Sequence, residues 1–223
     1  MGPDMFRLPE GFCIDKTEVT RGQYEAWLST NPASDGQAAA CAGNHSYTPS
    51  CSWEPGSDQE KPVVCVDWCD AQAFCSAAGK RLCGALGSGG AYDFASYDDP
   101  KVSEWHAACT SGGKYGFTYG DEFNTDTCRD ADADDYTTWG IVDVGSQPGC
   151  RSPDAAYSKL SDMSGNVAEW DDSCESDDAA AGCRIRGGSY QHHAHGTRCD
   201  MGRALKWPRG RAVDSVGFRC CAD

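Results

Sequence analysis

The sequence predicts one compact globular domain of short helices and short strands, held together by disulfide bonds. The 223 residues include 15 cysteines, which are spread over the whole chain. None of them forms a Cys-x2-Cys pair, so we do not expect a zinc ribbon or an iron–sulfur cluster. Aromatic residues make up 10 % of the chain, enough to build a core. No linker or repeat divides the sequence, which favours a single domain over residues 1–223 with a core from about residue 8.

The first predicted elements are a strand over 12–15 and a helix that begins after Thr20. Thr20 is a good N-cap, and Gln23 three residues later completes a capping box. The helix would turn an apolar face inward, made of Tyr24, Trp27 and Leu28.

A second helix is predicted over 67–78, ended by Gly79 at its C-terminus. One or two helical turns are expected over 104–109. From Tyr115 onward the sequence predicts turns, loops and short strands. The loop over 31–60 contains two cysteines, Cys41 and Cys51, close enough in sequence to close a local ring.

Charge and cysteine content restrict the partners and the compartment. The formal net charge of −15 disfavours nucleic acid, whose phosphates would be repelled, and suits calcium or cationic ligands better. No run reaches the roughly 18 apolar residues of a membrane helix. So many cysteines indicate an oxidising compartment, so we expect a secreted, periplasmic or cell-surface protein whose leader has been removed. Because 15 is odd, at least one thiol is free or bonded to another molecule.

Two acidic segments are candidate calcium sites. Residues 130–135 hold four carboxylates, but Asp135 and Ile141 stand where an EF-hand loop needs Gly and Glu. A calcium site and a solvated acidic loop therefore both remain open for that segment. The second segment, 162–170, has a carboxylate near each end of a tight turn, which can wrap a hard cation. The alternative is a purely structural turn anchored in the core by Trp170.

Three of the five histidines lie within four residues, at His192, His193 and His195. On a strand, His193 and His195 would share one face, and two imidazoles can bind copper or zinc. An exposed polar loop without metal is the alternative.

Taken in order, several segments resemble the formylglycine-generating enzyme (sulfatase-modifying factor) family. The order of the segments matches that of the family along nearly the entire chain, and the density of cysteines resembles an exported branch common among myxobacterial proteins. The matching segments are Ile14-Asp-Lys-Thr-Glu-Val-Thr20, Pro62-Val-Val, Trp68 through Gly79-Lys-Arg-Leu82, Glu104-Trp105, Tyr119-Gly-Asp121, Leu160 through Trp170, Arg186-Gly-Gly-Ser-Tyr190 and Gly217-Phe-Arg-Cys220.

This resemblance implies an α+β fold, a variant of the C-type-lectin-like fold with little regular secondary structure and with bound calcium. It assigns one calcium site to the side chains of Asp162 and Glu169 and the carbonyl groups of Gly165 and Val167. A second, looser assignment falls on Asn124, Thr125 and Asp134 or Asp135. The resemblance also implies two disulfides, Cys75 with Cys220 and Cys109 with Cys199. For other cysteines we expect the local pairs Cys41–Cys51, Cys128–Cys150 and Cys174–Cys183.

The chain departs from the family where catalysis would occur. The family's oxidases hold copper(I) between two cysteines just after the Gly-Gly-Ser-Tyr segment. In this sequence His192 occupies the first of these positions, and the second has no cysteine counterpart. Without a thiolate pair, soft copper(I) coordination is lost. The resemblance therefore does not predict formylglycine synthesis by the usual route.

Two functions remain as hypotheses, with a weaker third. The first is a calcium-stabilised binding module for a protein, peptide or glycan, since related lectin-like domains bind ligands through this C-terminal stretch. Its contact residues would be Gln191, His193, His195, Lys206, Trp207 and Arg209. The second is a copper- or iron-dependent oxidase that uses the three clustered histidines on a sulfur-containing or peptide substrate. The third is a redox role for the vicinal Cys220-Cys221 or for the unpaired thiol, although Cys83 or Cys221 is more simply a partner within the disulfide framework.

Overall fold

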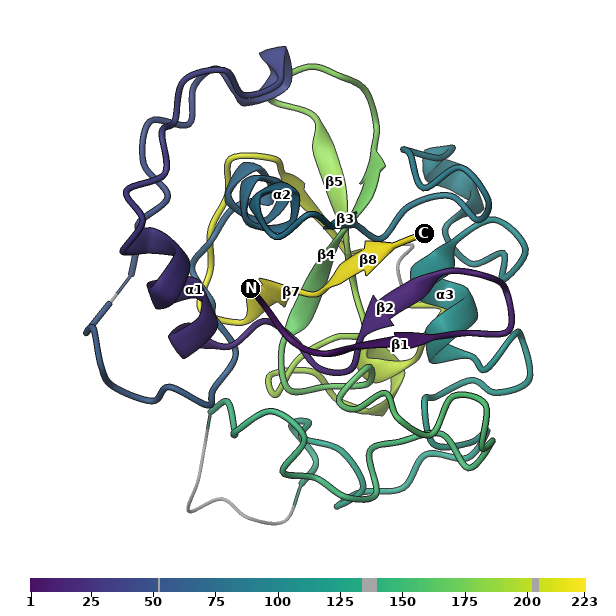
Figure 1. The fold of residues 1–223 in the computed structure, drawn as a ribbon. Helices are drawn as coiled ribbons and strands as arrows, with labels where there is room; N and C mark the ends of the chain where they lie inside the picture. The colour runs from purple at the N-terminus through teal and green to yellow at the C-terminus, as the bar shows by residue number, and fades with distance from the viewer. Residues whose placement is uncertain (52, 134–139, 202–204) are drawn as a thin grey trace.

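A computed structural model describes residues 1–51, 53–133, 140–201 and 205–223. Two four-stranded sheets stand at its centre, one antiparallel in the order β1-β2-β8-β3 and one mixed in the order β6-β5-β4-β7, in which β4 and β7 are parallel (Figure 1). Long irregular segments connect these short elements. The elements are β1 (Met5–Arg7), β2 (Cys13–Asp15), α1 (Arg21–Leu28), η1 (Ala39–Cys41), α2 (Trp68–Ala77), β3 (Arg81–Leu82), η2 (Phe94–Ser96), α3 (Glu104–Cys109), β4 (Ala168–Cys174), β5 (Gly182–Arg186), η4 (Ala194–Thr197), β6 (Lys206–Pro208), β7 (Val216–Phe218) and β8 (Cys220–Ala222).

Local capping explains where the helices begin. The capping box before α1 is confirmed, because Thr20 Oγ1 accepts from Gln23 N and Gln23 Oε1 accepts from Thr20 N. Helix α2 has a second capping box, formed by Asp67 and Asp70. The chain leaves α2 through Gly79 at a φ of 70°, a left-handed conformation that glycine adopts without strain. The predicted helices over 67–78 and 104–109 are therefore confirmed to within a residue at each end.

Two apolar clusters form the core, and strand β8 touches both. The larger cluster joins α1 and α2 to β4, β5 and β7, with Phe74 stacked on Tyr24 and edge-on to Phe218. The smaller one joins β2 and α3 to the loop around residues 157–163. Because side chains alternate along a strand, Cys220 of β8 enters the larger cluster and Cys221 the smaller one.

Seven disulfides join the described chain, and four of them match expected pairs. Cys75 is bonded to Cys220 and Cys109 to Cys199, the pairs that the family resemblance implied, and the local pairs Cys128–Cys150 and Cys174–Cys183 are also present.

The expected Cys41–Cys51 bridge is wrong. Cys41 is bonded to Cys69 and Cys51 to Cys65. The loop does not close on itself, because its first half lies along α2, where Asn44 Nδ2 donates to Asp70 Oδ1 at 2.7 Å. Its second half returns beside residue 65, where Ser50 N donates to the Cys65 carbonyl at 2.9 Å. Each cysteine therefore meets a partner outside the loop's own ring.

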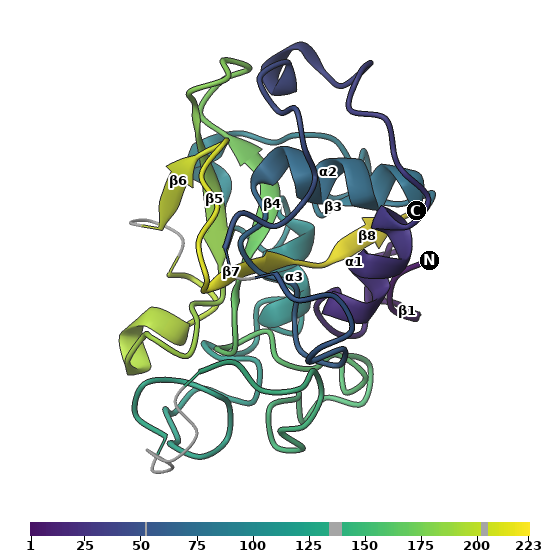
Figure 2. The same ribbon diagram turned by 90° about the vertical axis from the view of Figure 1, so that its left-hand side faces the viewer.

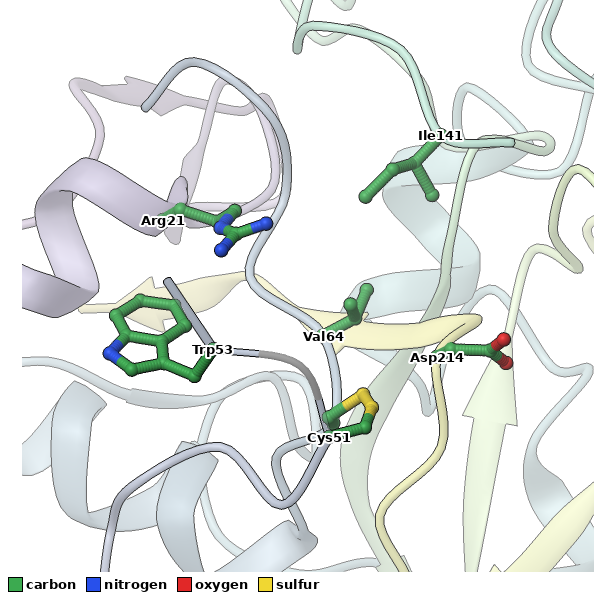
Figure 3. Close-up of a pocket in the computed structure, with 7 residues that line it drawn as sticks. Arg21, Cys51, Trp53, Val64, Ile141 and Asp214 are labelled. Atoms are coloured by element: carbon green, nitrogen blue, oxygen red, sulfur yellow. A yellow bond between two sulfur atoms is a disulfide. The ribbon is translucent and has the colours of Figure 1, made fainter. Parts of the chain in front are cut away.

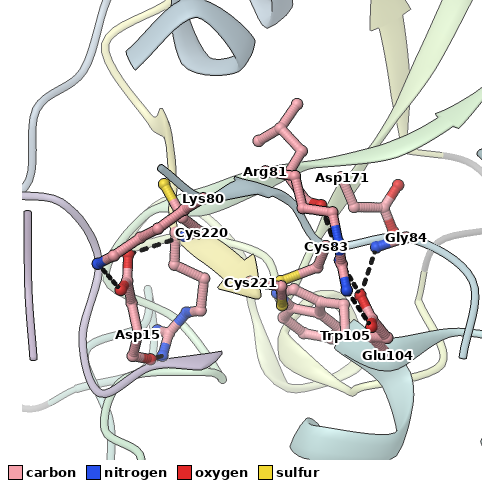
Figure 4. The surroundings of a disulfide bond; sticks show 12 residues. Asp15, Lys80, Arg81, Cys83, Gly84, Glu104, Trp105, Asp171, Cys220 and Cys221 are labelled. Carbon is pink, nitrogen blue, oxygen red and sulfur yellow. Dashed lines mark hydrogen bonds and ion pairs between the residues drawn. A yellow bond between two sulfur atoms is a disulfide. The ribbon is translucent and has the colours of Figure 1, made fainter. Parts of the chain in front are cut away.

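The vicinal cysteines are not bonded to each other, which removes them from the redox hypothesis. Cys220 joins α2, whereas Cys221 is bonded to Cys83 on the opposite face of β8 (Figure 4). All 15 cysteines fall within the described ranges, and the unpaired one is Cys13 on β2. This density of bridges indicates an oxidising compartment outside the cytoplasm. Among the described residues, no helix has both the length and the apolar character that crossing a membrane requires.

Candidate ligand-binding site

A pocket of about 280 Å³ opens beside the start of α1, and we call it the Trp53 pocket. Arg21 and Trp53 stand on one side of it and Ile141 and Asp214 on the other, with Val64 and a disulfide between them (Figure 3). The lining residues are Arg21, Cys51, Trp53, Val64, Cys65, Ile141 and Asp214. The pocket therefore combines an aromatic wall, a cation, an anion and an apolar floor, the mixture typical of small ligand sites.

The fold fixes the aromatic and cationic wall. Arg21 is the first residue of α1, and its guanidinium carbon lies 5.0 Å from the centre of the Trp53 ring. The Arg21 guanidinium pairs with Asp58 at 3.7 Å. The buried Nε of Arg21 has no hydrogen-bond partner among the described residues. Trp53 packs edge-on against Tyr24 of the core at 6.3 Å. The wall is thus held in place on its inner side.

The opposite wall connects the pocket to the segment after the Gly-Gly-Ser-Tyr motif. Burial raises the pKa of the Tyr190 hydroxyl, and the nearby carboxylate of Asp214 raises it further. Tyr190 Oη also accepts a hydrogen bond from Gln191 Nε2 at 2.8 Å. Tyr190 therefore lies near Asp214 on this wall, although the sequence separates it from Arg21 by about 170 residues.

The histidine segment is not the strand that the sequence suggested. It is a tight turn followed by the 3-10 helix η4, because Ser189 binds His192 twice. The Ser189 backbone N and the hydroxyl Oγ lie 3.1 and 2.9 Å from His192 Nδ1. Since Gln191 N donates to the same hydroxyl, we assign that hydroxyl as a donor to Nδ1, which leaves the ring proton on Nε2. His192, which the family resemblance places at the first catalytic cysteine, closes a turn.

The other two histidines diverge from it. His193 Nδ1 binds Asp132 Oδ1 at 2.6 Å, and the other oxygen of Asp132 accepts from Ala194 N. His195 is exposed on η4. Within the described ranges, no group of three or more His, Cys, Asp and Glu side chains is placed to hold a metal ion. The expectation that His192, His193 and His195 form one copper or iron site finds no support in this geometry.

The expected ligand contacts divide into exposed and buried residues. Gln191, His193 and His195 are exposed, and none of them is among the residues that line the Trp53 pocket. Lys206 on β6 forms an ion pair with Glu175. Trp207 is half-buried, and the guanidinium carbon of Arg211 lies 3.6 Å from the centre of the Trp207 ring. Arg209 is a correction, because it is 3 % exposed, lies over Trp68 and donates to the Ser176 carbonyl. Figure 2 shows β6 at one edge of the second sheet and the yellow-green segment of η4 below it.

The turn over 162–170 is built around buried charge. Glu169 receives two 2.7 Å hydrogen bonds from Arg219 and one from Trp105 Nε1. Asp162 and Glu18 are buried nearby, so three carboxylates face one guanidinium. Burial, and then repulsion from Asp162, raises the pKa of Glu18, and burial raises the pKa of Asp162 to about 6.

The charge of these groups favours a cation, but within the described ranges no three carboxylates are placed to hold a metal ion. The excess of negative charge is buried, and Glu18 Oε2 has no hydrogen-bond partner in the part of the chain that the structure describes. All the candidate donors are oxygens, which calcium prefers. Gly165 cannot be replaced here, because a Cβ would lie 2.3 Å from the Arg129 carbonyl oxygen. Trp170 is fully buried, as the alternative of a purely structural turn anchored by Trp170 also expects.

The looser calcium assignment gains little from the structure. Asn124 is exposed, and its backbone N donates to Tyr119 Oη at 3.4 Å. Thr125 is half-buried beside it. Asp134 and Asp135 lie outside the described residues, so this assignment stays a prediction.

Sequence reasoning missed Arg21, Trp53, Ile141 and Asp214 as site residues. No local pattern marks them, because they come from four separate segments that only the fold brings together. The single hint was an aromatic residue in a polar loop, at Trp53.

Comparisons with known proteins agree with this architecture. The sulfatase-modifying factor enzyme 1-like domain matches residues 3–223. A search of curated proteins finds no match. Among solved structures, PvdO from Pseudomonas aeruginosa is 22 % identical with a TM-score of 0.63, covering 95 % of this chain and 80 % of its own.

Two further structures show the same fold. CarF is 21 % identical with a TM-score of 0.59, covering 95 % of this chain and 85 % of its own. Treponema denticola variable protein 1 is 21 % identical with a TM-score of 0.57, covering 95 % of this chain and 84 % of its own. The domain match over nearly the full length, together with the low content of regular structure and the disulfide framework, shows that the chain belongs to the sulfatase-modifying factor enzyme 1-like (FGE-sulfatase) family.

Proposed function

We propose that this chain is an exported, calcium-stabilised binding domain whose peptide, protein or glycan ligand occupies the Trp53 pocket and the exposed turn at 191–195. The observation that carries the proposal is the position of that pocket. Its wall residue Asp214 lies near Tyr190, which directly precedes the segment where the family resemblance places the copper-binding cysteines of the oxidases, and His192, which the resemblance places at the first of these cysteines, closes a turn. The site therefore keeps a recess for a ligand and has lost the thiolate chemistry.

The lining of the Trp53 pocket favours recognition of a mixed polar and aromatic group. A tryptophan face offers a large contact area at little entropic cost, and tryptophan is enriched among residues that dominate binding energy. Arg21 and Asp214 on opposite walls would orient the ligand through charge. Treponema denticola variable protein 1 has the same fold and is a variable protein, which supports a scaffold that presents changeable surface side chains.

The binding proposal predicts loss of affinity in two pocket variants. A hit is first obtained by screening the intact protein against peptide and glycan arrays. We then expect Trp53→Ala to weaken binding about thirtyfold or more, since truncating a hot-spot residue costs about 2 kcal/mol or more. Asp214→Asn tests the opposite wall without touching the core, because Asp214 is exposed. Calorimetry of each variant gives the change in affinity.

The matched control is Asp143→Asn, which removes an exposed charge near Ile141 but outside the lining. It should bind as the wild type does. If both pocket variants, folded by circular dichroism, keep full affinity for every array hit, the pocket does not bind the ligand.

For the calcium part of the proposal, the side chains of Asp162 and Glu169 and the carbonyl groups of Gly165 and Val167 would hold the ion. Calcium supplies positive charge to a buried acidic site. We expect calcium at about a hundredfold excess over its dissociation constant to add about 2.7 kcal/mol to the free energy of unfolding, relative to protein in chelator. Asp162→Asn should abolish the gain, while the exposed Asp178→Asn should retain it. Equal melting temperatures with calcium and with chelator would contradict the site.

A further inference from the structure

The Cys51–Cys65 bridge differs from the other six disulfides in its accessibility. Both of its cysteines line the Trp53 pocket, and Figure 3 shows the bridge between Trp53 and Asp214. Cys51 is exposed, whereas the other six bridges join buried cysteines, apart from the half-buried Cys174. A reagent in solvent can therefore approach Cys51 while the fold stays intact.

The segment that carries Trp53 is held to the rest of the protein by backbone contacts on each side of it. Before it, Ser50 N donates to the Cys65 carbonyl at 2.9 Å. After it, Gly56 N donates to Glu25 Oε2 at 3.0 Å. The ends of the segment therefore have attachments that do not depend on the bridge.

Between these two points, noncovalent contacts to α1 and the bridge itself fix the described residues. Trp53 packs edge-on against Tyr24, and the Arg21 guanidinium lies over the Trp53 ring and donates to the Glu54 carbonyl at 3.4 Å. The bridge at Cys51 is the covalent attachment in this set. Opening it would leave the position of Trp53 to the weaker contacts.

Cys65 connects the bridge to the opposite wall of the pocket. Its backbone N donates at 2.9 Å to the carbonyl of Val213, the residue before Asp214. Its φ is 62°, in the left-handed region that residues other than glycine rarely adopt. Such strained positions occur preferentially at ligand clamps and switch regions. The bridge thus joins the Trp53 wall to the Asp214 wall through a strained residue.

We propose that the Cys51–Cys65 bridge is a redox switch of the Trp53 pocket, opened by a dithiol reductant. A thiolate of the reductant attacks the exposed cysteine, Cys51, and forms a mixed disulfide with it. The bond between the two cysteines breaks, and Cys65 leaves as a thiolate that takes up a proton. The second thiol of the reductant loses its proton and attacks the reductant sulfur of the mixed disulfide, which releases Cys51 as a thiol. The protein gains two electrons and two protons, and the dithiol becomes a disulfide.

Opening the bridge lowers the affinity of the pocket, because Trp53 must then be ordered again when a ligand binds. This consequence rests on the proposed binding function of the Trp53 pocket. The selective reduction of Cys51–Cys65 does not rest on it, so the two can be tested separately.

The first experiment measures which bridge opens first. The intact, oxidised protein is treated with dithiothreitol or with reduced thioredoxin, alkylated with iodoacetamide at successive times and mapped by peptide mass spectrometry. We expect Cys51 and Cys65 to be alkylated at least about tenfold faster than Cys174 and Cys183, the bridge with the next most accessible cysteine. At equal thiol concentration, faster opening by thioredoxin identifies a protein dithiol as the reductant, and faster opening by dithiothreitol identifies a small one. Equal rates for the two bridges, or earlier opening of any buried bridge, would overturn the proposal.

The second experiment measures the consequence for the pocket in the reduced protein and in the Cys51→Ser/Cys65→Ser variant. Deuterium uptake by the peptide that contains Trp53 should rise in both. A ligand from the arrays whose affinity depends on Trp53 should bind about tenfold more weakly to both, because the segment has to be ordered on binding. The matched control is Cys174→Ser/Cys183→Ser, which removes a bridge outside the lining and should change neither quantity.

The outcomes separate this inference from the proposed function. If Trp53→Ala leaves every affinity unchanged, the binding function fails, and deuterium uptake alone decides whether the bridge controls the segment. Unchanged deuterium uptake after reduction, or full affinity of the reduced protein for a ligand that depends on Trp53, would overturn the switch.

Discussion

Removing both bridges that start from the vicinal cysteines is expected to lower the free energy of unfolding by about 7 kcal/mol, and removing either one by about 3. Cys75–Cys220 and Cys83–Cys221 close nearly the same long loop, with sequence separations of 145 and 138. While one of these two bridges remains, the other closes a ring of only about 11 residues, which consists of residues 75–83 and 220–221. When both are gone, the shortest ring runs through Cys109–Cys199 and holds about 50 residues, so the second loss costs more.

The measurement is denaturant unfolding of the two double-alanine variants and of the quadruple variant, under conditions that keep the other bridges oxidised. A cost near 7 kcal/mol approaches the whole stability of an ordinary domain, so the quadruple variant should be largely unfolded at room temperature. Removing Cys174–Cys183, with a separation of 9, serves as the short-loop control at about 3 kcal/mol. A quadruple variant that loses no more than a single-bridge variant would contradict the overlapping-loop explanation.

The bridges also show which parts of the structure were predictable. The capping box at Thr20 and the stop at Gly79 are local signals, and both were visible in the sequence. The partner of Cys41 was not, because it depends on where a 30-residue loop lies against α2. Pairing Cys41 with the next cysteine along the sequence gives Cys51, whereas the fold places Cys69 beside Cys41.

The candidate site follows the same division. The family resemblance places the first missing cysteine at His192, and the structure shows that His192 closes a turn through its contacts with Ser189. A serine three residues before a histidine was a local signal for that turn, and we interpreted the segment as a strand instead. Arg21, Trp53 and Asp214 meet only after the chain has folded, so no spacing rule finds their pocket. Arg209 was misassigned because burial of a guanidinium over Trp68 leaves no trace in sequence.

Replacing Arg219 by Met is expected to lower the free energy of unfolding by about 3–5 kcal/mol near pH 8, because it leaves buried carboxylates without their cation. Arg219 is fully buried and binds both oxygens of Glu169. It also lowers the pKa of Glu18 and of Asp162. The exposed pair Lys16–Asp4 provides the control, since Lys16→Met should cost less than about 1 kcal/mol.

The pH dependence of this loss separates charge from packing. With Arg219 present, burial already raises the pKa of Asp162 to about 6, and without it that pKa rises further. A carboxyl whose pKa is higher in the folded than in the unfolded state binds more protons when folded, so it stabilises the fold at low pH and loses this contribution as pH rises through the folded pKa. The Arg219→Met variant should therefore recover stability relative to the wild type as pH falls from about 8 to about 5. Unfolding curves at both pH values measure this. A loss that is the same at both would mean that the shape of the side chain, and not the charge balance of the three carboxylates, is what Arg219 contributes.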